Sequence, residues 1–212
     1  MVLYSYIFMN DRFIKRPLSY SQLSAWGYNK EEWYQRYIKN KPYPKNSAMQ
    51  TGNIIGDSIG TDKSLIPDLI PPGVKEFKLE AQLGDIYIVG YADHYCPKTK
   101  VLSENKTSTN RKKWTQGAVD RHKQLDMYCL MLALTHNTPP EDITIWLNYI
   151  PVIEAQDMRY YLPNPVEFYQ FPTKRTSEQV FTFAKEIENT VEDMHSYVLE
   201  REQNSGIVEL PT

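Results

Sequence analysis

The sequence has 212 residues, of which 41% are hydrophobic and 24% charged, and its formal net charge is −2. This composition is typical of a folded chain with a real core and excludes an intrinsically disordered protein. No apolar run is long enough to span a bilayer, and basic residues follow the apolar start instead of preceding it, so we expect a soluble, cytoplasmic protein. Two cysteines are too few for a disulfide framework or a cysteine-ligated iron–sulfur cluster.

The net charge conceals an uneven distribution of charge along the chain. Residues 11–45 contain eight basic and three acidic residues, and residues 104–124 contain six basic and two acidic. Residues 176–212 contain two basic and eight acidic. A net charge of −2 argues against binding nucleic acid by bulk attraction, but the two basic segments could still supply localised contacts.

The first third of the chain predicts helices. An apolar and aromatic face predicts a helix over residues 18–40, with Ser19 or Ser21 as its N-cap. The Lys-Pro-Tyr-Pro sequence at 41–44 ends it. A second helix is expected over residues 48–64, where a glycine at every fourth position would leave one face open to close packing or to a ligand.

Strands are predicted next. Residues 74–83 and 86–95 alternate in hydrophobicity, and the Gly-Asp pair between them is typical of a hairpin turn. Residues 100–107 predict a third strand. Ile143, Ile145, Leu147 and Tyr149 alternate as a strand, and residues 158–162 are its expected partner.

Two further helices are predicted in the second half of the chain. Thr115 is the expected N-cap of a helix that runs to Thr135. The last helix carries one apolar stripe with alternating steps of four and three residues, formed by Val180, Ala184, Ile187, Val191, Met194 and Val198. Thr176 and Gln179 at its start match a capping box.

This order of elements indicates an α/β protein: a central mixed β-sheet flanked by helices, with an N-terminal helical part. We expect a single domain over residues 1–212. Residues 1–73 would form its mainly helical part, and residues 74–212 the α/β core and the C-terminal helix.

Three polar residues are the clearest candidates for chemistry. Asp93 ends one predicted strand, while Glu104 and Lys106 lie two apart in the next and so point to the same face. If the two strands pair as a hairpin, the carboxylates converge at one edge of the sheet. Two carboxylates suit Mg²⁺ or Mn²⁺, and a nearby lysine can orient a metal-bound water or help to deprotonate it. Alternating Glu and Lys also occurs on ordinary solvated strand edges.

The following helix adds polar candidates. Arg121, Gln124 and Tyr128 have spacings of three and four, so they would share one helix face. The segment before that helix carries three more basic residues, Arg111, Lys112 and Lys113. Together these groups could bind a nucleic-acid backbone, although an ordinary polar helix face has the same pattern.

In this order, the motifs resemble the PD-(D/E)XK nuclease superfamily, and its RecB-like exonuclease branch in particular. The signature residues are Asp93, Glu104-Asn105-Lys106 and Gln124-Leu125-Asp126-Met127-Tyr128. Ser19-Tyr20-Ser21-Gln22-Leu23 resembles the N-terminal helix of that branch, and Glu76-Phe77-Lys78-Leu79 its first core strand. The similarity covers roughly residues 18–134.

The resemblance implies a metal site formed by Asp93, Glu104 and the backbone carbonyl of Asn105, with Mg²⁺ or Mn²⁺ as the cofactor. It implies that Lys106 is the catalytic lysine. It also implies that the glutamine and tyrosine of the next helix line a nucleic-acid groove.

The sequence departs from this branch in two ways. Many members carry a metal-binding histidine in a Gly-x-x-x-His pattern before the core strands, whereas this chain has Gly56 at that position and Asp57 next. The third metal-binding carboxylate is therefore left open between Asp57, Glu76 and Glu80. The cysteine that cluster-bearing relatives have after the first helix is also missing, so we expect no iron–sulfur cluster.

The expected function is metal-dependent hydrolysis of DNA phosphodiester bonds. Exonuclease action in recombination, repair or phage DNA processing is favoured, because the glutamine–tyrosine helix resembles the exonuclease branch. An endonuclease of the same fold is an alternative, and so is a non-catalytic module that binds nucleic acid or supports assembly. The sequence has no Walker motif, so a helicase or recombination activity would belong to a partner protein.

Overall fold

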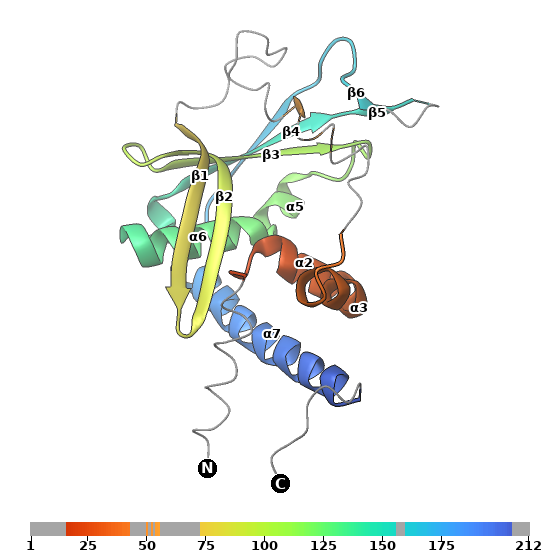
Figure 1. Ribbon diagram of the computed structural model, residues 1–212. Coiled ribbons are helices and arrows are strands. Elements are labelled where there is room, and N and C mark those ends of the chain that lie inside the picture. Colours follow the sequence, from red (N-terminus) through yellow and green to blue (C-terminus); the bar gives the residue numbers. More distant parts are fainter. Residues whose placement is uncertain are drawn as a thin grey trace.

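The computed structural model describes residues 16–42, 50, 52, 54–55, 73–155 and 160–204 (Figure 1). Asp57 and most of the helix predicted over residues 48–64 lie outside the described residues. Within them, no helix combines the length and the apolar character needed to cross a membrane.

A five-stranded sheet in the order β1-β2-β3-β4-β7 forms the centre of the protein. Its strands are β1 (Val74–Leu83), β2 (Ile86–Cys96), β3 (Val101–Ser108), β4 (Thr144–Pro151) and β7 (Tyr169–Thr173). Only the β3–β4 pair is parallel, so the sheet is mixed, as the sequence predicts. A second, two-stranded sheet pairs β5 (Ile153–Glu154) with β6 (Tyr160–Tyr161).

Helices flank the central sheet and confirm the predicted α/β architecture. They are α2 (Tyr20–Tyr28), α3 (Lys30–Trp33), the π-helical turn η1 (Tyr34–Ile38), α5 (Gln116–Asp120), α6 (Lys123–His136), the 3₁₀ turn η2 (Pro140–Asp142) and α7 (Ser177–Asn204). In Figure 1, α6 lies across one face of the sheet behind β1 and β2, and α7 extends below it toward α2 and α3. Most of the buried apolar side chains of these layers form one large core, and Ile150 of β4 belongs to a second, smaller cluster with Ile55 and Val152.

The helix predicted over residues 18–40 is interrupted at Asn29. There the backbone is extended (φ −157°, ψ 104°), and the Asn29 side chain accepts a hydrogen bond of 3.0 Å from the Glu32 N–H. Asn29 thus ends α2 and caps α3. Ser19 occupies the N-cap position of α2, although its side chain makes no capping hydrogen bond.

The helix predicted over residues 115–135 is also two helices. Thr115 caps the first as expected, because its hydroxyl accepts from the Ala118 N–H at 3.3 Å. The chain then breaks at Arg121 and His122, where His122 has an extended backbone (φ −77°, ψ 100°). Arg121 therefore does not share a helix with Gln124, which corrects the single polar face that the spacing predicts.

The predicted partner of the strand over residues 143–149 is wrong. The described part of residues 158–162 contains β6, which pairs with β5 instead. The true partners of β4 are β3 and β7, and Pro172 of β7 lies opposite Trp146. Proline lacks a backbone N–H and is tolerated mainly on edge strands, which is where β7 lies. Because of this proline, the hydrophobic pattern of the sequence does not predict the strand.

Two predictions at turns and caps are confirmed. Gly84, in the turn between β1 and β2, has a positive φ of 55°, which favours glycine. At the start of α7 the Thr176 N–H donates to Gln179 Oε1 (2.9 Å), and the Gln179 N–H donates to Thr176 Oγ1 (3.2 Å). The whole predicted apolar stripe of α7 is buried.

Candidate active site

The first carboxylate of the site lies where β2 and β3 separate. These strands pair only over His94–Cys96 and Val101–Ser103, so Asp93 has no β3 partner residue. Its side chain bonds to β3 instead, because Asp93 Oδ2 accepts a 2.6 Å hydrogen bond from the Asn105 backbone N–H. The sheet thereby fixes the Asp93 side chain beside the neighbouring residue, Glu104.

Glu104 supplies a second, almost fully buried carboxylate. Its side chain on β3 is one partner of a 2.6 Å ion pair, in which Glu104 Oε1 accepts from Lys106 Nζ. The other oxygen, Oε2, is buried and has no hydrogen-bond partner. A buried carboxylate oxygen without a partner is costly unless a cation compensates it. Glu104 therefore has a free oxygen suited to a divalent cation.

The surroundings of Asp93 disfavour its ionised form. Burial, reinforced by the negative charge of Glu104, raises the pKa of Asp93 to about 8. The Asn105 N–H and the Lys106 ammonium oppose this effect without cancelling it. A bound divalent cation would reverse the balance, because it stabilises both ionised carboxylates. This donor set fits Mg²⁺ or Mn²⁺.

A third carboxylate is not assembled among the described residues, which contain no group of three acidic, histidine or cysteine side chains able to hold a metal. Lys75 pairs with His94 and Phe77 with Ala92, so Glu76 lies opposite Asp93. Its charge contributes to the raised pKa of Asp93, and its φ of 50° is unusual for a residue other than glycine.

Glu80, the other described candidate, has different partners. Its carboxylate forms a 2.6 Å ion pair with Lys78 and accepts from the Tyr87 hydroxyl at 2.6 Å. Glu76 is therefore the described acid that lies beside the Asp93–Glu104 pair, and Asp57 falls outside the described residues.

Lys106 is held between the sheet and α6. Its ammonium donates to Glu104 Oε1 and to Gln124 Oε1, both at 2.6 Å. Gln124 Nε2 in turn donates to the Tyr128 hydroxyl (2.7 Å), which donates to the Tyr91 carbonyl oxygen (2.7 Å). Burial raises the pKa of Tyr128, so its hydroxyl stays protonated and keeps this role. The network links β3, α6 and β2.

The predicted basic residues are not gathered at Lys106 as Gln124 and Tyr128 are. Arg111 forms a 2.6 Å ion pair with Glu167, while Lys112 and Lys113 are exposed in the loop after β3. Arg121 is exposed, and its guanidinium lies against Gly117 of α5. The structure thus brings Gln124 and Tyr128 to Lys106 but does not bring Arg121 onto their helix.

A groove of about 780 Å³ opens beside Lys106. Ser19, the N-cap of α2, and residues of α2 that include the exposed Tyr28 line it, together with residues of β2 and α6, among them Gln124 and Tyr128. Gly90 keeps β2 close to α6, because a Cβ there would lie 2.7 Å from Met131 Cε and 2.9 Å from Tyr128 Cε1. Tyr91 and Arg36 also line the groove.

Sequence reasoning missed Asn148 on β4. Its side chain is fully buried, and Asn148 Nδ2 donates to Asn105 Oδ1 at 2.9 Å while Asn148 Oδ1 accepts from Gln170 Nε2 at 3.1 Å. These bonds fix Asn105, the residue between Glu104 and Lys106. A lone asparagine within an otherwise apolar strand was the available signal, since buried amides require partners.

Comparison with protein-family models and with curated proteins finds no match to this sequence. Solved structures do match it. An alkaline exonuclease from Laribacter hongkongensis, LHK-Exo, matches over 90% of this chain and 93% of its own, with a TM-score of 0.53 and 11% identity. A phage-related exonuclease from Haemophilus somnus 129PT matches over 81% of each chain (TM-score 0.52, 13% identity).

A third structure, a putative exonuclease from Eubacterium rectale, matches over 99% of this chain and 88% of its own, with a TM-score of 0.53 and 14% identity. At these identities the comparisons show that this chain shares a fold with the three proteins.

Proposed function

We propose that this chain is a metal-dependent deoxyribonuclease that removes nucleotides from DNA ends. The observation that carries the proposal is the meeting of Asp93 and Glu104 beside Lys106, with Glu104 Oε2 buried and unpartnered. The fold shared with proteins described as exonucleases supports the same reading. Membership of the RecB-like branch, the absence of an iron–sulfur cluster and a role in recombination, repair or phage DNA processing stay predictions.

Asp93, Glu104 and the carbonyl of Asn105 would hold the metal. When bound, Mg²⁺ or Mn²⁺ supplies a Lewis acid for the scissile phosphate and lowers the pKa of a bound water. The Asn105 N–H orients Asp93, and Asn148 holds the Asn105 side chain, so the donors are fixed before substrate arrives.

Lys106 orients the attacking water and stabilises charge on the phosphate. Its ammonium is fixed by two acceptors from different elements, Glu104 and Gln124, so little reorganisation is needed when substrate binds. The groove beside it accepts the strand. Exposed tyrosines in that groove can stack on bases, and the exposed Lys112 and Lys113 can contact phosphates.

A non-catalytic module that binds nucleic acid is the second candidate. One observation favours it: among the described residues, no third ligand joins the carboxylate pair to complete a metal site. The orphaned Glu104 oxygen argues for catalysis, because a site that holds no cation gains nothing from burying it.

The test is a cleavage assay on end-labelled linear DNA and on closed circular DNA, each with Mg²⁺ or Mn²⁺. We expect nucleotide release from linear DNA only, and its loss in Glu104→Ala and Lys106→Ala. Lys100→Ala is the matched control, because Lys100 forms an exposed ion pair with Asp142. Cutting of the circle would indicate an endonuclease. Binding without any cleavage would favour the module, and equal cleavage by all variants would contradict the assigned site.

A further inference from the structure

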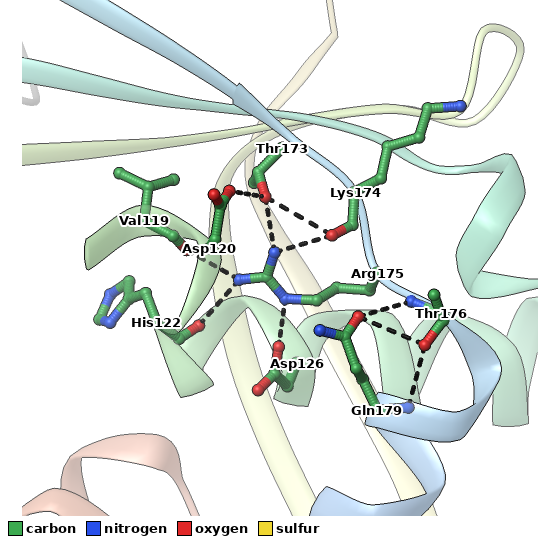
Figure 2. Close-up of polar contacts among 9 residues, drawn as sticks. All are labelled: Val119, Asp120, His122, Asp126, Thr173, Lys174, Arg175, Thr176 and Gln179. Carbon is green, nitrogen blue, oxygen red and sulfur yellow. Dashed lines mark hydrogen bonds and ion pairs between the residues drawn. The ribbon is translucent and has the colours of Figure 1, made fainter. Parts of the chain in front are cut away.

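Arg175 is a buried cation in the short link between β7 and α7, with only 1% of its surface exposed. All of its donor nitrogens are used, as Figure 2 shows. Its Nε pairs with Asp126; its Nη1 donates to Thr173 Oγ1 (2.8 Å) and the Lys174 carbonyl (2.9 Å); its Nη2 donates to the carbonyls of Val119 (2.9 Å) and His122 (3.3 Å).

The link that carries Arg175 is anchored on both sides. Thr173 pairs with Ile145 of β4, and Thr176 begins the capping box of α7 (Figure 2). The Ser177 hydroxyl also bonds to the Glu141 carboxylate at 2.9 Å. Arg175 therefore projects from a rigid support, and its position follows that of the sheet.

The acceptors of Arg175 lie at the break between α5 and α6. The Val119 carbonyl at the end of α5 accepts from the His122 N–H at 3.1 Å, and Arg175 Nη2 adds a second, shorter bond to it. It also binds the carbonyl of His122, the residue just before α6, and the Asp126 carboxylate in the first turn of α6. One side chain thus ties the end of α5 to the start of α6, in addition to the backbone bonds of that segment.

Gln124 lies between two of these contact points, His122 and Asp126. Its Oε1 accepts from Lys106 Nζ, so the start of α6 sets where the lysine ammonium is held. Lys106 belongs to β3, which is joined to β7 through β4. Lys106 is therefore connected to Arg175 in two ways. One runs through the sheet, from β3 to β7, and the other runs through the start of α6.

We propose that Arg175 is a positioning residue for Lys106. It acts by holding the start of α6, and hence Gln124, at a fixed place relative to β3. The proposal rests on the proposed function, in which Lys106 orients the attacking water. A purely structural arginine would affect stability alone, whereas a positioning residue also affects the rate of the chemical step.

The test compares Arg175→Lys with Thr173→Val and Val198→Ala. Lysine keeps the charge of Arg175 but cannot reproduce its fork of donors, and Thr173→Val removes one acceptor. Val198 is buried near the other end of α7, roughly 30 Å away along the helix axis, so its truncation lowers stability without touching the break. Thermal unfolding, kcat and KM on linear DNA, and the labelling rate of Lys106 by an amine-reactive reagent are measured for each full-length variant.

We expect kcat of Arg175→Lys to fall by about a hundredfold, since a small displacement of a catalytic group has that cost, while KM stays unchanged. Lys106 should label faster once its Gln124 acceptor moves away. Thr173→Val should change both readouts in the same direction, and Val198→Ala neither. Unchanged kcat and labelling in a folded Arg175→Lys would overturn the proposal.

Two further outcomes are decided by the same measurements. If Arg175→Lys fails to fold, Thr173→Val decides, and wild-type values for it contradict the proposal. If the wild type cleaves no DNA, the proposed function fails, while the labelling rate of Lys106 still tests whether Arg175 positions it.

Discussion

Lys106 Nζ on β3 donates a 2.6 Å hydrogen bond to Gln124 Oε1 at the start of α6. The sequence places both residues at the site but gives them separate roles, one catalytic and one for binding nucleic acid. In the structure the glutamine is a direct partner of the lysine, and its own amide nitrogen is engaged by Tyr128. Gln124 thus orients the lysine whether or not it also contacts DNA.

Replacing Gln124 by Met should lower kcat by roughly one to two orders of magnitude with little change in KM, because the lysine loses one of two fixed acceptors. Gln82→Met is the control, since Gln82 is exposed near the β1–β2 turn. Steady-state cleavage of linear DNA checks both variants. A kcat for Gln124→Met equal to that of Gln82→Met would argue against the orienting role.

The raised pKa of Asp93 predicts a pH-dependent stability in metal-free protein. Folding raises this pKa from 3.8 to about 8, so the folded state keeps a proton that the unfolded state releases. Its contribution is complete below pH ~4 and is lost as the pH rises toward ~8. Each unit of pKa shift corresponds to about 1.4 kcal/mol, so the loss is on the order of several kcal/mol.

Urea unfolding of wild type and Asp93→Asn at pH 5 and pH 8, with a chelator present, measures this effect. The variant cannot ionise at that position, so its advantage over wild type should grow from pH 5 to pH 8. Saturating Mg²⁺ should reduce the difference by stabilising the ionised wild-type pair. If the difference in unfolding free energy between wild type and variant does not change with pH, folding does not raise the pKa of Asp93.

Gly90→Ala should destabilise the protein by about 1–3 kcal/mol and reduce activity, because the added methyl group overlaps Met131 and Tyr128. The matched control is Gly27→Ala in α2, where no atom lies within 4 Å of the added Cβ. That change should be neutral or stabilising by up to about 1 kcal/mol. Thermal unfolding compares them, and equal effects would contradict the close approach of β2 to α6.

The basic loop after β3 should contribute salt-dependent binding. Lys112→Ala with Lys113→Ala should weaken DNA binding at all sequences and reduce the slope of log K against log salt by about 2. Arg111→Ala should have a smaller effect, since Glu167 already neutralises Arg111. Fluorescence anisotropy with labelled DNA, in a Glu104→Gln background, measures the slope. If the double substitution leaves this slope unchanged, the DNA does not contact the two lysines.

Periodic patterns in the sequence predicted the regular elements of the fold. The apolar stripe of α7 and the hairpin at Gly84 depend on neighbours close in the chain, so local pattern is sufficient. The break at Asn29 and the break at His122 were missed, because the sequence on both sides of each keeps a helix-like pattern while the extended backbone of one residue interrupts the helix. Partner choice for β4 is a long-range property, and Pro172 concealed the strand that it pairs with.

The candidate site was partly predictable for the same reason. Asp93, Glu104 and Lys106 follow from strand alternation and from their resemblance to a known signature. Asn148 and Arg175 act through bonds to residues 43 and 49 positions away. Local periodicity in the sequence does not predict contacts between residues so far apart, so these supporting residues can be recognised only in the folded structure.

In the proposed nuclease, Asp93 and Glu104 hold a divalent metal that is required for the hydrolysis of DNA. Glu104→Gln tests it most directly, since this change keeps the size of the side chain while removing the charge on its unpartnered oxygen. Nucleotide release from linear DNA is measured across a titration of Mg²⁺ for wild type and variant. We predict metal-dependent release by wild type and a rate lower by about three orders of magnitude or more in Glu104→Gln. Equal rates, or release that persists in excess chelator, would contradict the claim.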